Sequence, residues 1–249
     1  MIKSLFSAFL MYSRIPMPKT EWNENNRKYV LCFFPLIGGV IGGVFVVWYW
    51  LCQKFSLGNT IFAVFGVGIP VWITGGIHLD GFCDVQDAKA CMGSREKCLE
   101  VMKDSRVGAF AVIHLCLYFL LQFGIFTQIH SYRILSICAL GFVLSRAESG
   151  FCATVFRYAA AKSSVDNFHN AENKNSIIAA EIFYMIIVSA AMLFLNRISG
   201  LCAVLSSIGY MIRYRNFAYK KFGGVTGDLA GYFLQNCELI VCLCAVIPC

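Results

Sequence analysis

The sequence predicts an all-α fold: a polytopic integral membrane helical bundle of about seven transmembrane helices with a cytosolic N-terminus. Of its 249 residues, 58% are hydrophobic and only 14% are charged, whereas a soluble domain usually carries about 25% charged residues. The apolar residues also fall in blocks of about 20, which is the length needed to cross a hydrocarbon core roughly 30 Å thick. These two observations favour a membrane protein over a soluble one.

Seven apolar runs separated by charged clusters give the expected spans. They lie at 29–52, 58–79, 109–130, 133–156, 177–195, 198–213 and 226–248. The sixth run is the shortest, because Arg213 and Arg215 end it. No internal repeat or low-complexity linker divides the chain, so we expect a single membrane-embedded domain over 1–249. Residues 1–28 lack a good signal-peptide cleavage site, and we expect them to remain as a cytosolic or interfacial N-terminal segment.

The positions of lysine and arginine support this arrangement and give its orientation. Of the 21 lysines and arginines, 17 fall before the first span or in alternate gaps between the spans. This alternation is what the positive-inside rule predicts for seven spans with a cytosolic N-terminus. The net charge of +7 then belongs to cytosolic loops, where it can meet anionic lipid headgroups or an anionic substrate.

The 13 cysteines do not indicate a disulfide framework or a zinc site. No pair has CxxC spacing, and several lie in apolar runs, where a thiol behaves as a small hydrophobic group. We expect reduced cysteines, which are typical of a cytoplasmic membrane protein.

Three aspartates follow the second apolar run and are the strongest candidates for a chemical site. Asp80, Asp84 and Asp87 are spaced i, i+4 and i+7; in a helix they would share one face, within an arc of about 60°. Stacked carboxylates destabilise a bare helix but can bind a divalent cation, and oxygen ligands favour Mg²⁺ or Mn²⁺ over zinc. The alternative is a solvated acidic helix end.

The same loop carries groups suited to phosphate. Lys103 and Arg106 can contact phosphate oxygens, lysine as a point charge and arginine through its planar fork. Asp104, between them, could add a metal ligand. An ordinary charged loop before a span is the alternative.

Several charged residues fall inside the expected spans, where each costs at least roughly 2.5–3.5 kcal/mol and normally faces the interior of the bundle. Asp228 begins the last span, at the depth expected for Asp80, and could complete the metal site. Glu238 lies about 15 Å deeper. A structural pairing with Arg146 and a catalytic role are equally consistent with this depth. His78 precedes the three aspartates and is either a helix-end residue or a base. Glu148 and Glu181 are the other acidic residues within spans.

These motifs together resemble a known family. The segment Thr74–Asp87, TGGIHLDGFCDVQD, is similar to the signature of the cobalamin synthases, also called adenosylcobinamide-GDP ribazoletransferases. The other matching stretches, which cover nearly the whole chain, are 13–18 (SRIPMP), 33–38 (FFPLIG), 102–108 (MKDSRVG) and 223–228 (GGVTGD). The sequence departs from the family pattern at Ala88, where glycine is usual, and after Arg157, where Tyr158–Ala161 replaces a proline-glycine segment.

The resemblance implies a reaction and a site. α-Ribazole, or its 5′-phosphate, attacks the phosphate borne by the cobinamide of adenosylcobinamide-GDP, and GMP leaves. The expected metal ligands for Mg²⁺, with Mn²⁺ possible, are Asp80, Asp84 and Asp87, assisted by Asp104 or Asp228; one of these carboxylates would be the general base. The expected substrate and phosphate contacts are His78, Lys103, Arg106, Arg146 and Arg157.

The resemblance also sets the expected setting. It implies a multi-pass protein of the bacterial cytoplasmic (inner) membrane with its active site on the cytosolic side. The lipid bilayer and the two small-molecule substrates are the expected partners, with a homo-oligomer possible and no nucleic acid.

Two other functions fit parts of the pattern. A CDP-alcohol phosphotransferase also has clustered aspartates at the cytosolic face, but its aspartate-glycine pair is followed by alanine-arginine, and Asp80-Gly81 is followed by Phe82-Cys83. A secondary transporter would place its charges near the midplane, often in repeated halves, whereas here the aspartates gather at one side and no repeat is present.

Overall fold

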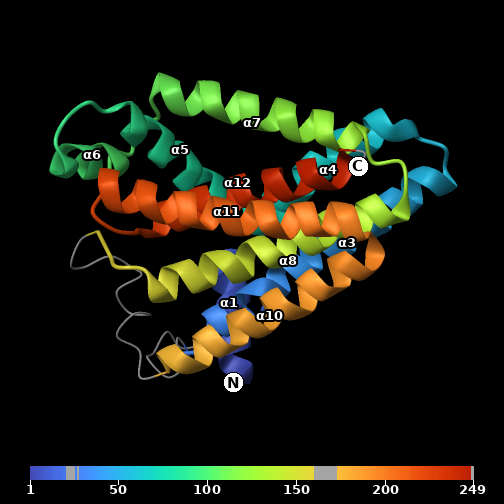
Figure 1. Ribbon diagram of the computed structural model, residues 1–249, viewed down its shortest axis with the longest axis horizontal. Helices are drawn as coiled ribbons and strands as arrows, with labels where there is room; N and C mark the ends of the chain where they lie inside the picture. The colour runs from blue at the N-terminus through green and yellow to red at the C-terminus, as the bar shows by residue number, and fades with distance from the viewer. Residues whose placement is uncertain (21–25, 27, 160–172, 248–249) are drawn as a thin grey trace.

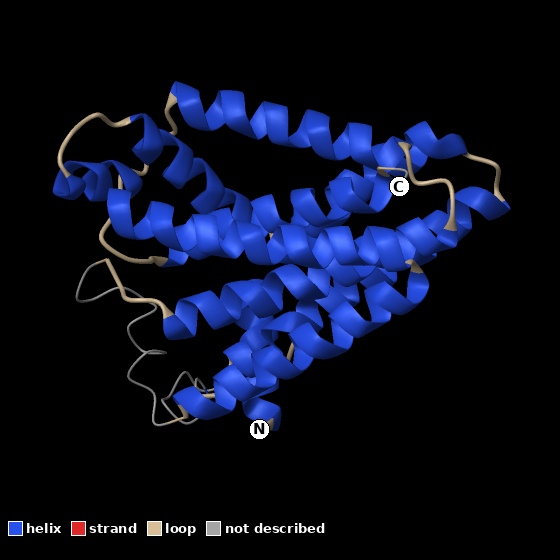
Figure 2. Cartoon of the chain, in the orientation of Figure 1, coloured by secondary structure: helices blue, strands red, loops and turns tan. Residues whose placement is uncertain are grey.

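The computed structural model describes residues 1–20, 26, 28–159 and 173–247, and this part of the chain is helical with no β-strand (Figure 2). The helices are α1 (Ile2–Tyr12), the 3-10 helix η1 (Leu31–Phe33), α3 (Phe34–Lys54), α4 (Gly58–Thr74), α5 (Ile77–Ala90), α6 (Arg95–Met102), α7 (Ala109–Thr127), α8 (Tyr132–Val155), α10 (Lys174–Leu195), α11 (Arg197–Lys221) and α12 (Gly227–Val246). The predicted all-α bundle is confirmed.

The number of membrane-length helices differs from the predicted seven. Among the described residues, five segments are long and apolar enough to cross a membrane, namely η1 with α3, α7, α8, α10 and α12. The pair α4 and α5 adds a sixth if it forms one broken span. The predicted run 198–213 lies in α11, which is 25 residues long but is not among these apolar helices, because Arg213, Arg215 and several serines and glycines lower its hydropathy.

The outside of the bundle is apolar, and its centre holds polar groups. Large hydrophobic side chains are exposed along α7, α10 and α11; on α11 they form a stripe of Ile198, Leu201, Leu205, Ile208 and Ile212. The central helix α8 packs against α3, α10 and α12 and buries Ser145, Arg146 and Glu148. Exposed apolar stripes of this extent are expected where a helix faces lipid. The fold is therefore that of a multi-pass membrane protein.

The second expected span, 58–79, is not continuous. It ends at Thr74, and the axes of α4 and α5 differ by 97°. Gly75 and Gly76 form the break with φ of +69° and +80°, a left-handed conformation that glycine adopts without steric cost. The N-terminal segment packs into this break: the backbone N–H of Arg14 donates to the Ile73 carbonyl at 2.7 Å, and a Cβ on Gly75 would overlap the Arg14 side chain.

The basic and acidic loops meet at one end of the bundle. In Figure 1 the left end gathers α6, the ends of α5, α8 and α11, and the beginnings of α7 and α12. The turns from α3 to α4, from α7 to α8 and from α10 to α11 lie at the opposite end (Figure 1). The loops that carry the family motifs are therefore neighbours in space.

Candidate active site

The three aspartates of the second motif lie on one helix, as their spacing predicted. Asp80, Asp84 and Asp87 all belong to α5. This helix packs closely on α12: a Cβ on Gly81 would come within 2.8 Å of the Asp228 Cα. Only a residue without a side chain permits this approach, which brings Asp228 alongside the α5 carboxylates.

The start of α12 fixes where Asp228 points. Thr226 caps this helix, because its hydroxyl oxygen accepts a hydrogen bond from the Leu229 N–H at 3.2 Å. Asp228 is thus in the first turn, where the helix dipole favours a negative charge. On the same helix, a Cβ on Gly231 would come within 2.9 Å of the His78 carbonyl oxygen, so α5 and α12 are in close contact over several residues.

The clustered carboxylates repel one another. Burial, followed by the charges of Asp80, Asp228 and Asp87, raises the pKa of Asp84 to about 7. Asp84 lies on α5, which is not one of the five membrane-length helices. This mutual repulsion is what a bound cation would relieve.

The fit to a metal ion depends on the donor set. Among the described residues, no three or more His, Cys, Asp and Glu side chains are already arranged around a metal position. However, Mg²⁺ is commonly held by one or two carboxylates, with water and substrate phosphates completing its shell. The oxygen-only group of Asp80, Asp84 and Asp228 fits this arrangement, and Mg²⁺ stays a prediction.

Asp87 has a different set of partners from the one expected of a metal ligand. Its two carboxylate oxygens accept hydrogen bonds from the backbone N–H groups of Gly108, at 2.7 Å, and Ala111, at 2.9 Å. These N–H groups belong to the first turn of α7, whose N-cap residue Gly108 provides no side-chain cap. Asp87 therefore joins α5 to α7, and this role is independent of any cation.

Asp104 is engaged by its neighbour Arg106. The Arg106 side chain donates to both Asp104 oxygens, at 3.0 and 2.7 Å, and its backbone N–H donates to one of them at 3.0 Å. These hydrogen bonds lower the pKa of Asp104 to about 2. The Arg106 side chain is 88% exposed. The structure thus leaves this pair at the surface and does not bring Asp104 into the carboxylate cluster.

Lys103 and Arg157, by contrast, lie beside the 223–228 motif. Lys103 is close enough to Asp228 to interact with its charge, and the Thr226 hydroxyl donates to the neighbouring Met102 sulfur at 3.5 Å. The Arg157 side-chain Nε donates to the Gly223 carbonyl at 3.1 Å. The two basic groups thus flank the segment that leads to Asp228.

The loop after Arg157 is held by the same motif. The Val225 N–H donates to the Arg157 carbonyl at 2.8 Å, and the Ala159 N–H donates to the Val225 carbonyl at 3.1 Å. Ala160 and Ala161, the rest of the departure from the family pattern, lie outside the described residues.

Arg146 is fully buried and paired with Glu238, which is the structural alternative of the two roles that the sequence left open for Glu238. Arg146 Nη1 lies 2.6 Å from Glu238 Oε1, and both side chains are 0% exposed. The same nitrogen also donates to the Phe142 carbonyl at 2.8 Å. The structure does not bring Arg146 to the cavity wall, so the phosphate contact expected of it is not formed by this geometry.

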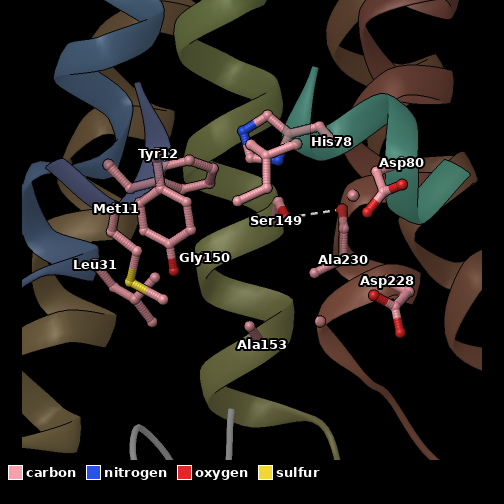
Figure 3. Close-up of a pocket in the computed structure, with 14 residues that line it drawn as sticks. Met11, Tyr12, Leu31, His78, Asp80, Ser149, Gly150, Ala153, Asp228 and Ala230 are labelled. Carbon is pink, nitrogen blue, oxygen red and sulfur yellow. Dashed lines mark hydrogen bonds between the residues drawn. The ribbon is translucent and has the colours of Figure 1, made fainter. Parts of the chain in front are cut away.

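A cavity of about 190 Å³ lies between the carboxylates and the N-terminal segment (Figure 3). Asp80 and Asp228 line one side, Met11 and Tyr12 line the other, and His78 lies between them. Ser149 of α8 lies between the two sides, and its hydroxyl donates to the Ala230 carbonyl at 3.1 Å.

The sequence analysis identified His78 but missed Tyr12 and Ser149. Neither is charged, and neither belongs to a spacing pattern of ligands. The only available signal for Tyr12 was its position directly before the motif at 13–18.

The fold and the site define a class: a multi-pass membrane enzyme whose aspartates, together with lysine and arginine, meet at one end of a helical bundle. Comparison with known proteins identifies the family. The chain belongs to the cobalamin-5-phosphate synthase family, whose model matches residues 4–246.

Curated relatives agree over nearly their whole length. The chain is 42% identical over 246 residues to an adenosylcobinamide-GDP ribazoletransferase of Lachnoclostridium phytofermentans, covering 99% of this chain and 94% of the relative. It is 32% identical over 253 residues to the same enzyme of Listeria monocytogenes, covering 99% and 98%. With that of Clostridium perfringens it shares 30% identity over 240 residues, covering 95% and 94%. No solved structure matches the chain.

Proposed function

We propose that this protein joins adenosylcobinamide-GDP to α-ribazole, or to its 5′-phosphate, in the synthesis of cobalamin. The products are adenosylcobalamin, or its 5′-phosphate, and GMP. The relatives that bear the name of this transferase match the chain over nearly their whole length. The observation that carries the proposal is the cluster of Asp80, Asp84 and Asp228, of which Asp80 and Asp228 line a cavity.

The reaction exchanges one phosphorus–oxygen bond for another. A ribose hydroxyl oxygen of α-ribazole, one that stays free in the 5′-phosphate as well, bonds to the phosphorus that carries cobinamide, and the bond from this phosphorus to the bridging oxygen breaks. GMP leaves with that oxygen and the bonding electrons, while the hydroxyl proton passes to a carboxylate acting as general base. Asp87 is already engaged by two N–H groups, so the candidates for this base are Asp80, Asp84 and Asp228.

The charge of the diphosphate must be neutralised while the two reacting oxygens are held in line. Lys103 and Arg157 flank the 223–228 motif and are suited to hold phosphate oxygens. Asp80, Asp84 and Asp228 would hold Mg²⁺ or Mn²⁺, which would supply the remaining positive charge.

We also propose that the protein resides in the cytoplasmic membrane with this site on the cytosolic side. The support is the distribution of charge: 17 of 21 lysines and arginines belong to the N-terminal segment and alternate loops, which is the cytosolic pattern.

The test is GMP release by the purified protein in detergent, supplied with adenosylcobinamide-GDP, α-ribazole and Mg²⁺. We expect EDTA to stop turnover, and Mg²⁺ or Mn²⁺, but not Zn²⁺, to restore it. Asp84→Ala is expected to lower turnover at least about a hundredfold, because both charge neutralisation and proton transfer depend on the cluster. Asp104→Ala is the matched control and should retain most activity. Absence of GMP release by folded protein would refute the transferase assignment; undiminished turnover in EDTA would refute the metal.

A further inference from the structure

The part of the cavity around His78 is aromatic rather than charged. His78 is only 6% exposed, and no described residue pairs with its Nε2. Two aromatic rings flank the imidazole: Tyr12 stacks at 6.1 Å between centroids with 26° between planes, and Phe34 packs edge-on at 5.5 Å. Figure 3 shows Tyr12 on one side of α8, the two aspartates on the other, and the His78 ring between them.

An unpaired polar atom in such a place needs a partner. Burying a polar group without a hydrogen bond costs about 1–3 kcal/mol in proteins, and the Tyr12 and Phe34 rings that pack on the imidazole leave its Nε2 without one. Met11 and Leu31 complete this part of the cavity. The walls thus favour a flat, apolar ligand that brings one hydrogen-bonding atom.

The size of the cavity narrows the ligand further. An engineered protein cavity of about 150 Å³ binds benzene, so this cavity of about 190 Å³ admits a fused bicyclic base. A corrin ring is far too large for it. Guanine is bicyclic but carries several donors and acceptors, and most of them would lose their partners against Met11, Leu31 and Phe34.

We propose that His78, Tyr12 and Phe34 form the subsite for the benzimidazole base of the incoming α-ribazole. The base lies along the aromatic rings, and its free ring nitrogen accepts a hydrogen bond from His78 Nε2–H. The ribose then extends along α8 past Ser149, which brings its attacking hydroxyl toward Asp80 and Asp228. This inference rests on the proposed function, and it makes His78 a residue that selects and positions the nucleoside.

The experiment measures binding separately from turnover. Direct binding of α-ribazole to the protein in detergent is compared with binding of an indole analogue, in which a C–H group replaces the free ring nitrogen. We expect the wild-type protein to bind the analogue about tenfold more weakly, the effect of one lost hydrogen bond. His78→Phe keeps an aromatic ring but removes the donor, so it should bind both ligands equally and raise the KM for α-ribazole with little change in the KM for adenosylcobinamide-GDP.

His114→Phe is the matched control. His114 is exposed on α7, and its Nδ1 lies 2.7 Å from the Phe110 carbonyl oxygen, so this substitution should preserve discrimination between the two ligands. If His78→Phe does not fold, the wild-type comparison still decides, and Tyr12→Leu adds a second test because loss of stacking should weaken both ligands.

The outcomes separate the inference from the proposed function. Equal binding of α-ribazole and the indole analogue by the wild-type protein overturns the inference. It is also overturned if GMP competes with α-ribazole for this site and His78→Phe loses GMP binding. In either case GMP release by the wild-type protein would leave the proposed function intact. Absence of both α-ribazole binding and GMP release would reject both.

Discussion

Gly81 holds α5 against α12, and its substitution tests whether this contact sets the geometry of the site. In Gly81→Ala the added Cβ would lie 2.8 Å from the Asp228 Cα and 2.9 Å from its carbonyl oxygen. Ordinary contact begins near 3.4 Å, so the two helices must separate locally by about 0.6 Å. The atoms that meet are backbone atoms, which cannot rotate away as a flexible side chain can.

This separation of the two helices would displace the Asp228 carboxylate relative to those of Asp80 and Asp84. A misplacement of about 1 Å can cost an enzyme about a hundredfold in rate, so we expect kcat/KM for GMP release to fall about tenfold to a hundredfold. The strain costs about 1–3 kcal/mol, partly offset by about 1 kcal/mol from the better helix propensity of alanine. The thermal midpoint in detergent should therefore fall only slightly.

Gly43→Ala provides the control, because a Cβ at Gly43 would have no neighbour within 4 Å. This variant gains the same helix propensity without moving the site, so its activity should equal that of the wild-type protein. If Gly81→Ala also turned over at the wild-type rate, the argument that the α5–α12 contact fixes Asp228 beside Asp80 and Asp84 would be wrong.

Two further predictions concern the support of the site. Glu238→Leu should destabilise the protein by about 3–5 kcal/mol, because it leaves the buried Arg146 charge unpaired. The double variant with Arg146→Leu should recover much of this loss. Thermal unfolding in detergent measures both variants, and a double variant as unstable as the single one would contradict the prediction. Asp87→Ala should lower the thermal midpoint, because losing the hydrogen bonds from Gly108 and Ala111 costs about 0.5–2 kcal/mol. Asp87→Asn keeps one acceptor oxygen, so its midpoint should lie between those of the wild-type protein and Asp87→Ala. Equal midpoints for all three proteins would exclude the capping role.

Residue spacing predicted much of this molecule. The i, i+4 and i+7 aspartates share a helix because helical geometry depends only on local sequence. The pairing of Arg146 with Glu238 followed from the cost of leaving a charge alone in a membrane. Both inferences use rules that apply whatever the rest of the fold does.

The errors have equally physical causes. The Gly75-Gly76 pair is a turn signal, but apolar residues on both sides hid the 97° bend. Asp104 was one of two residues, with Asp228, expected to assist the metal site, yet an aspartate readily bonds to groups two residues away, and here Arg106 supplies them. Tyr12 reaches the cavity through a tertiary contact that no local pattern in the sequence encodes.

The break between α4 and α5 leaves backbone groups without their usual helical partners, and a bilayer has no solvent to satisfy them. The chain provides its own substitutes: the Arg14 N–H for the Ile73 carbonyl, and the Thr74 hydroxyl for the Pro70 carbonyl and the Gly76 N–H. The N-terminal segment thus supplies to an interrupted helix a hydrogen bond that water would supply in a soluble protein. The N-terminal segment precedes every membrane span in the chain, yet it completes the hydrogen bonding of the second one.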